Sequence, residues 1–420
     1  MKKEKHMSYL DLYLDLTDDD LALKENAHKF ALEVMRPIAK KLDEMTPEQV
    51  IAKGSPLWDF LKKGYELGYH SILIPESYGG MGLSPIQQAI VFEELAWGSV
   101  GLTVHIAVCS FPAFAASMVP EDEMINNIIV PFCECKDASI RGCWGGTEPD
   151  HGSDFCMTGY PSFRDPKIKS NCMARLDGDE WVINGQKAAW VSGGTVSTHT
   201  ALFCNVDPSM GHAGGGIFIV PMDLPGVAKG KPLNKIGQRD LNQGELYFDN
   251  VRIPKTYGLV GPDAYEAILE ITFSATCALM GIMAAGVARA AFEEALSYAK
   301  ERVQGGKPLI EHQNIQVKLF DMLSRIEMTR YLSRAAFLFN QNTSTPADEY
   351  SVMAKVAGTN AAFQTCHDAI QILGGNGLSR EYLVEKLFRD ARAMLIEDGS
   401  NDSLSISSGY KIIKTYPRRM

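Results

Sequence analysis

Apolar and polar residues follow different periods in three successive parts of the chain. Up to about residue 130, apolar residues recur at spacings of three and four, as in NAHKFALEVMRPI, which is typical of amphipathic helices. The next part carries short apolar runs bounded by Gly, Pro and Asn, which favour strands. Helical spacing then returns. The pattern predicts an α+β protein of three domains, helical over 1–134, β over 135–261 and helical over 262–420.

Local signals refine this prediction. Ser84 stands before the apolar run PIQQAIVFEELAWG and is expected to cap a helix there. Asn184-Gly185 lies between two β-rich runs, a pair typical of a tight hairpin. Because no helices alternate with the strands, we expect the middle domain to be an antiparallel barrel or sandwich.

Composition excludes several classes of function. The chain of 420 residues has a formal net charge of -10 and no basic cluster, so nucleic acid is not an expected partner. Its nine cysteines show no spacing typical of zinc, and no metal site is expected. No basic-then-apolar leader is evident, and no apolar run approaches the roughly 20 residues that cross a bilayer. We therefore expect a cytoplasmic protein without membrane insertion.

Six segments, in order, resemble the acyl-CoA dehydrogenase family over essentially the whole chain. They are GGTEPDHGSD (145–154), INGQKAAWVSGG (183–194), KIGQRDLNQGELYFDNVRIP (235–254), ERVQGGKPLIEHQNIQ (301–316), IQILGGNGLSREYLVEKLFRDAR (370–392) and EDGSND (397–402). The resemblance implies a C-terminal four-helix bundle, FAD as cofactor, an acyl-CoA substrate, a homotetramer and an electron-transferring flavoprotein as partner. It also implies abstraction of the alpha proton of the thioester and transfer of a beta hydride to flavin N5, giving an enoyl-CoA.

The resemblance places flavin-contacting residues in most of these segments. The set comprises Trp144, Gly146, Thr147, Gly152, Ser153, Trp190, Ser192, Arg302, Gln304, His312, Gln313, Gln371, Gly374, Gly375, Ser400 and Asp402. For Gln371 to Gly375, the family pattern implies contact with the FAD of a neighbouring subunit. From the residues alone, IQILGGNG is also typical of a helix C-terminus. A tryptophan in a strand is also typical of the hydrophobic core.

Two adjacent acids carry the catalytic hypothesis. Asp398 stands where most of the family has a catalytic Glu, so the acid is one methylene shorter, and Glu397 is an alternative base or a partner that tunes Asp398. Without the resemblance, an acidic pair before GSNDSLSIS also fits a helix N-terminus. The shortened acid suggests an unusual acyl group, cyclic, branched or dicarboxylic.

Substrate contacts follow from the same alignment. Ser153, His105, Ser274, Thr276 and Cys277 fall in segments that line the family's substrate site, and the Arg often found beside them is missing. A lone His among apolar residues also fits a core position. Two alternatives to a dehydrogenase stay open: a flavin oxidase of the same fold, resembling nitroalkane oxidase, and a non-catalytic subunit that binds flavin or CoA.

Overall fold

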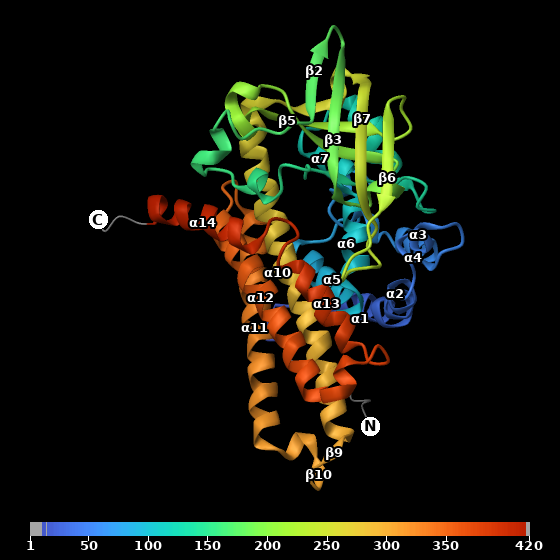
Figure 1. The fold of residues 1–420 in the computed structure, drawn as a ribbon, viewed down its shortest axis with the longest axis vertical. Helices are drawn as coiled ribbons and strands as arrows, with labels where there is room; N and C mark the ends of the chain where they lie inside the picture. The colour runs from blue at the N-terminus through green and yellow to red at the C-terminus, as the bar shows by residue number, and fades with distance from the viewer. Residues whose placement is uncertain (1–10, 14, 417–420) are drawn as a thin grey trace.

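The computed structural model describes residues 11–13 and 15–416. The sheet lies at one end of an elongated molecule, the long C-terminal helices form the other end, and the N-terminal helices pack against their junction (Figure 1). One hydrophobic core runs through both helical parts, and a smaller core fills the sheet.

The N-terminal helices are α1 (Asp18–Phe30), α2 (Arg36–Asp43), α3 (Pro47–Ile51), α4 (Pro56–Glu66), α5 (Pro85–Gly98), α6 (Val100–Cys109), α7 (Phe111–Met118), α8 (Asp122–Met124) and α9 (Val130–Glu134). The strands are β1 (Trp144–Gly145), β2 (Met173–Asp177), β3 (Glu180–Ser192), β4 (His199–Asn205), β5 (Gly215–Pro221), β6 (Val227–Pro232), β7 (Gln243–Pro254) and β8 (Gly258–Val260). The C-terminal elements are α10 (Pro262–Glu301), β9 (Val303–Gln304), β10 (Lys307–Pro308), α11 (Gln313–Asn342), α12 (Asp348–Leu373), α13 (Val384–Met394) and α14 (Asn401–Thr415).

The start of α5 follows the sequence closely. Ser84 accepts a hydrogen bond from the backbone of Gln87, and the Gln87 side chain bonds back to the Ser84 backbone. Such a reciprocal cap satisfies two backbone N–H groups that the helix itself cannot. The predicted cap at Ser84 is therefore confirmed.

The middle domain is built on β-structure, but its sheet is mixed and open rather than an antiparallel barrel. Its strands follow the order β6-β7-β3-β2-β4-β5-β8, with β1 paired to β4 off this path. Strands β1 and β2 both run parallel to β4. Closure would require the edge strands β6 and β8 to pair, but β8 is only three residues long and leads straight into α10.

Asn184-Gly185 forms a bulge inside β3, so the predicted hairpin turn is wrong. The register of β3 against β7 shifts between Ile183 and Gly185. The Asn184 side chain bonds to the backbone N–H and the side chain of Asn250 on β7. Gly185 has φ +143°, and a Cβ there would meet the Cys172 backbone at 2.5 Å. A glycine is needed for close packing here, not for a turn.

Helix α10 is long and apolar enough to cross a membrane by length and composition, contrary to the expectation that no such run exists. However, 83% of its most apolar window is buried inside the protein. It packs against α5, α11, α12 and α13, at the centre of the bundle. Its apolar length therefore serves the core of the fold.

Buried ion pairs join the N-terminal helices to the bundle. The Arg289 guanidinium on α10 donates to both oxygens of Glu94 on α5, at 2.8 and 2.5 Å. The neighbouring Glu93 accepts from Arg330 and Arg334 of α11 at 3.0 and 3.1 Å. All five side chains are almost fully buried, so each charge depends on its partners for solvation.

We expect Arg289→Met to lower the free energy of unfolding by about 3 kcal/mol or more, because it leaves the Glu94 carboxylate buried without its bidentate partner. Denaturant unfolding followed by circular dichroism measures this. The control is Arg252→Met, which removes a cation paired with Asp177 and Glu180 on the exposed surface of the sheet. Equal losses for both variants would contradict a role for burial.

Candidate functional site

A cavity of about 690 Å³ lies between the sheet, the N-terminal helices, α10 and the loop that precedes α14. Polar lining comes from Thr147, Ser153, Ser192, Asn234, Lys235, Gln238, Gln243, Thr276, Arg392, Glu397 and Asp398. Apolar lining comes from Leu73, Phe92, Val104, Ala107, Val108, Phe111, Trp144, Phe155, Cys156, Trp190, Ile236, Phe273, Leu279, Met283, Ala393 and Ile396. An apolar cavity with few convergent polar groups is the usual form of a ligand site.

The loop between α13 and α14 presents Asp398 to the cavity. Asp398 has φ +53°, a left-handed conformation that Asp tolerates better than most residues. The fully buried Lys355 ammonium on α12 donates to the Gly399 carbonyl at 2.7 Å and to the Asn401 side chain at 2.8 Å. The Ser400 backbone N–H donates to Ser153 Oγ at 2.8 Å, which joins the loop to the sheet domain. The loop that carries Asp398 is therefore bonded both to the helical bundle and to the sheet domain.

Glu397 is the second acid of the loop. Burial, and then the charge of Asp398, raises the pKa of Glu397 to about 7. The Gln238 amide opposes this by donating to its carboxylate at 2.7 Å, as do the positive charges of Lys355 and Lys235. Glu397 thus exchanges its proton near neutral pH.

Asp398 also has a raised pKa, because burial outweighs the opposing charge of Lys355. The Lys235 ammonium comes from a residue that also lines the cavity, and it donates to the Leu241 carbonyl and the Gln243 side chain, both at 2.8 Å. Burial lowers the pKa of Lys235 to about 8, against the charges of Asp240, Glu397 and Asp390. Titratable groups with shifted pKa values that meet in a cavity are a mark of catalytic sites.

The loop from Gly146 to Met157 forms a further part of the cavity wall and contacts the first loop through Ser153. Its Glu148 side chain pairs with Lys187 of β3 at 2.7 Å, and both side chains are fully buried. The same ammonium donates to the Gly146 carbonyl at 3.1 Å, and the backbone N–H of Ala188 donates to the Thr147 carbonyl at 2.8 Å. This buried pair fixes the loop against the sheet and so sets the positions of Thr147 and Ser153.

The structure brings many of the predicted residues to one cavity. Trp144, Thr147, Gly152, Ser153, Trp190, Ser192, Thr276, Glu397 and Asp398 all line it. Gly146 lies directly behind the wall, where a Cβ would meet the Phe155 ring at 2.7 Å. Ser400 caps α14 beside the cavity, and Asp402 follows in the first turn of that helix.

Three predicted substrate contacts do not line the cavity. His105 is fully buried in the helical core, where desolvation lowers its pKa to about 4. Ser274 is also fully buried and donates to the Glu270 carbonyl one turn back on α10. Cys277 is buried on the same helix, close enough to Asp398 and Lys355 for their charges to act on its thiol. None of the three is therefore placed to contact a ligand in the cavity.

A second group of predicted flavin contacts lies away from the cavity. Arg302, Gln304, His312, Gln313, Gln371, Gly374 and Gly375 occupy the end of the bundle around β9, β10 and the C-terminus of α12, and none of them lines the cavity. Figure 1 shows this end opposite the sheet. All except the half-buried His312 are exposed in the single chain.

Several site residues escaped prediction. Lys235, Gln238 and Gln243 lie within the quoted segment 235–254, so the resemblance marked their region without assigning them a role. Lys355 had only one signal, a lysine inside the apolar run SVMAKVAG. A buried lysine must find acceptors, and here they belong to a loop more than forty residues away in sequence.

Comparison with known proteins identifies the same family in all three domains of the chain. The acyl-CoA dehydrogenase N-terminal, middle and C-terminal domain models match residues 17–118, 143–251 and 267–407. Together the three matches cover most of the chain, in the order in which the domains occur here.

Individual relatives agree with this result. The mitochondrial short-chain specific acyl-CoA dehydrogenase of Rattus norvegicus is 31% identical over 96% of this chain and 92% of its own length. The probable acyl-CoA dehydrogenase YngJ of Bacillus subtilis is 32% identical over 95% of this chain and 99% of its own. Among solved structures, butyryl-CoA dehydrogenase from Megasphaera elsdenii superposes with a TM-score of 0.84 at 26% identity, covering 96% of this chain and all of that one.

We expect a carboxyl band in infrared difference spectra between pH 5 and 9 that disappears with a midpoint near 7, because Glu397 loses its proton there. Glu397→Gln should lack the band. Lys235→Met should move the midpoint upward, because the positive charge of Lys235 favours the ionised form of Glu397. A band that persists unchanged in Glu397→Gln would assign the titration to another group.

Proposed function

Because this chain belongs to the acyl-CoA dehydrogenase family and is therefore an oxidoreductase acting on the CH–CH group of acyl-CoA, we propose that Asp398 is the base that begins its reaction. The observation that carries this proposal is the placement of Asp398. It faces the cavity from a restrained loop, with a raised pKa and Glu397 beside it. A general base needs both reach and a pKa raised toward the operating pH.

We propose FAD as the cofactor, held in this cavity. Trp190, Ile236 and Ile396 line it with 58, 67 and 56% of their surfaces exposed, an apolar area that a planar ring would cover. Thr147 and Ser192 supply polar contacts at the same site. Bound FAD would supply the acceptor for the hydride that leaves the beta carbon. The residues present therefore fit the cofactor that the family implies.

Side chains and backbone groups of this chain carry out the proton transfer. The ionised Asp398 carboxylate takes the alpha proton of the thioester. The N–H groups of Asp398 and Gly399 have no acceptor in the part of the chain that the structure describes, and so are available to the thioester carbonyl. Donors placed there would stabilise the negative charge that develops on that oxygen. Glu397 adds a second negative charge above about pH 7, which strengthens its neighbour as a base.

We propose an apolar acyl group, straight, branched or cyclic, in place of the dicarboxylic alternative. Every residue that α5, α6, α7 and α10 contribute to the lining is apolar except Thr276. The lysine and arginine of the lining, Lys235 and Arg392, come from the other walls. A terminal carboxylate among these helices would lose its hydration without gaining a cation.

Pentanoyl-CoA and glutaryl-CoA form a matched pair for this proposal, since a carboxylate replaces the terminal methyl group. We expect pentanoyl-CoA to bleach the flavin absorbance under anaerobic conditions, and glutaryl-CoA to react with a kcat/KM lower by about 100-fold or more. Branched and cyclic thioesters complete the panel. Preference for glutaryl-CoA would overturn the proposed acyl class but not the base.

The proposed reaction has a separate test of its own. If none of these thioesters bleaches the flavin anaerobically, the proposed dehydrogenase reaction fails. Rapid reoxidation by O₂ with release of peroxide would favour the oxidase instead, whereas slow reoxidation is expected of the dehydrogenase.

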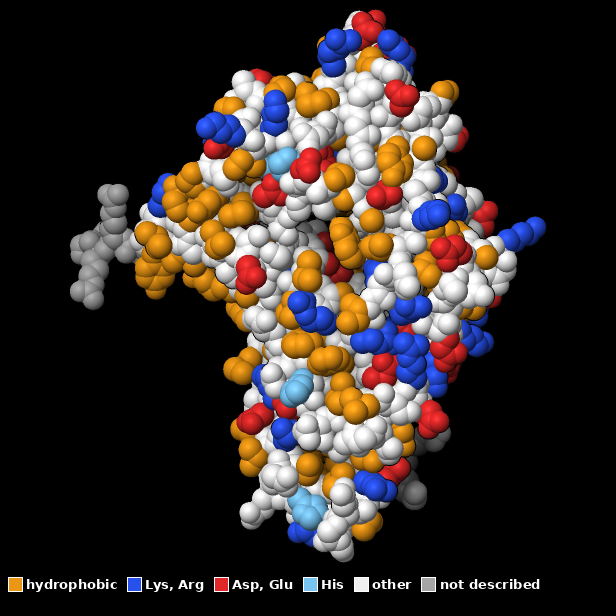
Figure 2. Space-filling model, in the orientation of Figure 1, with side chains coloured by type: hydrophobic (Ala, Val, Ile, Leu, Met, Phe, Trp, Pro, Cys, Tyr) orange, Lys and Arg blue, Asp and Glu red, His pale blue; other side chains and the backbone are white. Residues whose placement is uncertain are grey.

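We further propose a cytoplasmic homotetramer that passes its electrons to an electron-transferring flavoprotein. Large apolar side chains are exposed along α11, at Val317, Phe320, Leu323, Met328 and Phe339. Figure 2 shows such side chains gathered over α14 and over the bundle. Partner subunits would cover these faces and bring the predicted flavin contacts at the far end of the bundle to a neighbour's cofactor.

We expect Phe320→Asp to elute later than the wild type in size-exclusion chromatography and to lose bound FAD, because a charge in an apolar interface separates the subunits. Phe320 is 71% exposed in the single chain. The control is Leu176→Asp, an exposed apolar residue on the sheet. If Phe320→Asp keeps both the wild-type elution volume and its FAD, α11 is not a subunit contact.

A further inference from the structure

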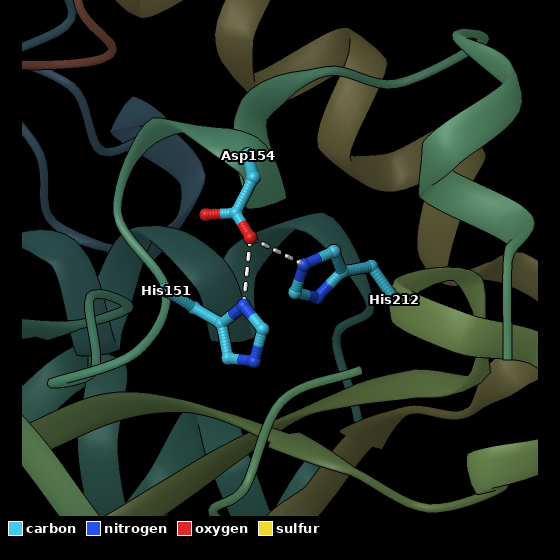
Figure 3. Close-up of side chains that lie close together, drawn as sticks. All are labelled: His151, Asp154 and His212. Atoms are coloured by element: carbon cyan, nitrogen blue, oxygen red, sulfur yellow. Dashed lines mark hydrogen bonds and ion pairs between the residues drawn. The ribbon is translucent and has the colours of Figure 1, made fainter. Parts of the chain in front are cut away.

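A second cluster of ionisable side chains lies outside the cavity. His151 Nδ1 and His212 Nε2 both contact Asp154 Oδ2, at 2.7 and 3.1 Å, as Figure 3 shows. The three potential ligand atoms lie within 4.8 Å of one another. We propose that His151, Asp154 and His212 form a binding site for a divalent transition metal ion, with zinc as the best fit.

The spacing of the ligand atoms suits such an ion. Zinc bonds to nitrogen and oxygen of about 2.0–2.2 Å place neighbouring ligand atoms of a tetrahedron roughly 3.3 Å apart. The two distances to Asp154 Oδ2, 2.7 and 3.1 Å, fall short of this by about 0.6 and 0.2 Å, so small side-chain movements open room for an ion. Three protein ligands would leave one position for water. The two imidazoles favour zinc and its neighbours over Mg²⁺ and Ca²⁺, which prefer oxygen ligands.

The charge of Asp154 also favours a bound cation. No lysine or arginine among the described residues lies within ion-pair distance of its carboxylate, which contacts the two imidazoles instead. When both histidines are neutral, the carboxylate charge has no formal countercharge. A bound cation would supply one and would replace the two hydrogen bonds with metal bonds from the same three atoms.

The surroundings hold the ligands in place. Ser170 Oγ lies 3.2 Å from His212 Nδ1, where the hydroxyl oxygen can accept a hydrogen bond from Nδ1–H and leave Nε2 free for a metal. The backbone of His151 exchanges two hydrogen bonds with Glu148, which the buried Lys187 fixes to the sheet. The side chain of His212 is 2% exposed, against 15% for His151 and 32% for Asp154, so one side of the site is open to solvent.

The position of the three ligands determines what a bound ion would do in the structure. His151 and Asp154 belong to the loop that carries Thr147 and Ser153 into the cavity, whereas His212 belongs to the segment Pro208–Gly214 between β4 and β5. A metal bound to all three would join the loop to the sheet at a second point, beyond the Lys187–Glu148 pair. We therefore assign the ion a structural role in the cavity wall.

The test is equilibrium dialysis of the chelator-treated holoprotein against Zn²⁺, followed by metal analysis and thermal unfolding. We expect one zinc per chain and a higher unfolding midpoint for the wild type, and neither for His212→Ala or Asp154→Asn. Ser170→Ala should bind about tenfold more weakly. Mg²⁺ and Ca²⁺ should cause no shift.

His367→Ala is the matched control, because His367 is an exposed histidine on α12. It should bind zinc as the wild type does. The proposal is overturned if the wild type binds no more zinc than His212→Ala, or if His367→Ala loses as much. Flavin content and circular dichroism in chelator report whether each variant folds. If His212→Ala does not, Asp154→Asn, which keeps the shape of the side chain, decides the matter alone.

Discussion

The Lys355 ammonium is the contact on which the site depends. It is fully buried on α12, and it obtains its acceptors from the loop that carries both acids. That loop in turn bonds through Ser400 to Ser153, whose own loop is anchored by the buried Lys187–Glu148 pair. A continuous path of hydrogen bonds and buried ion pairs therefore connects the bundle, the acids and the sheet. Each of the two loops is therefore anchored by a buried lysine.

Two lysines, Lys355 and Lys235, oppose the effect of burial on the acids of the loop. Burial raises the pKa of both acids, and the positive charge of Lys355 opposes the rise at each. The charge of Lys235 also opposes the rise at Glu397, and burial lowers the pKa of Lys235 to about 8. Asp398 makes no direct salt bridge among the described residues, and burial outweighs the charge of Lys355 there. In the proposed reaction, a raised pKa makes this carboxylate a stronger base.

The sequence was informative where function depends on short local patterns and less so where it depends on tertiary contacts. The Ser84 cap follows from a few consecutive residues, and the assignment of Asp398 follows from the resemblance of its segment to the family. His105 was misplaced because adjacent helical residues point about 100° apart, and the face of α6 toward the cavity holds Val104, Ala107 and Val108 instead. The hairpin turn predicted at Asn184-Gly185 was wrong because a glycine needed for close packing looks the same in the sequence as a glycine needed for a turn. Lys355 and the His151–Asp154–His212 cluster could not be found from spacing, since their members meet only after folding.

We propose that Asp398, and not Glu397, removes the alpha proton. The most direct measurement is stopped-flow anaerobic reduction of the flavin by a reactive apolar acyl-CoA in wild type, Asp398→Asn and Glu397→Gln. Asn keeps the shape of the side chain and tolerates the left-handed backbone at position 398. We expect that Asp398→Asn binds the thioester but is reduced more slowly by several orders of magnitude, whereas Glu397→Gln retains reduction with a changed pH dependence. Rapid reduction of Asp398→Asn, with loss of reduction in Glu397→Gln, would contradict it and make Glu397 the base.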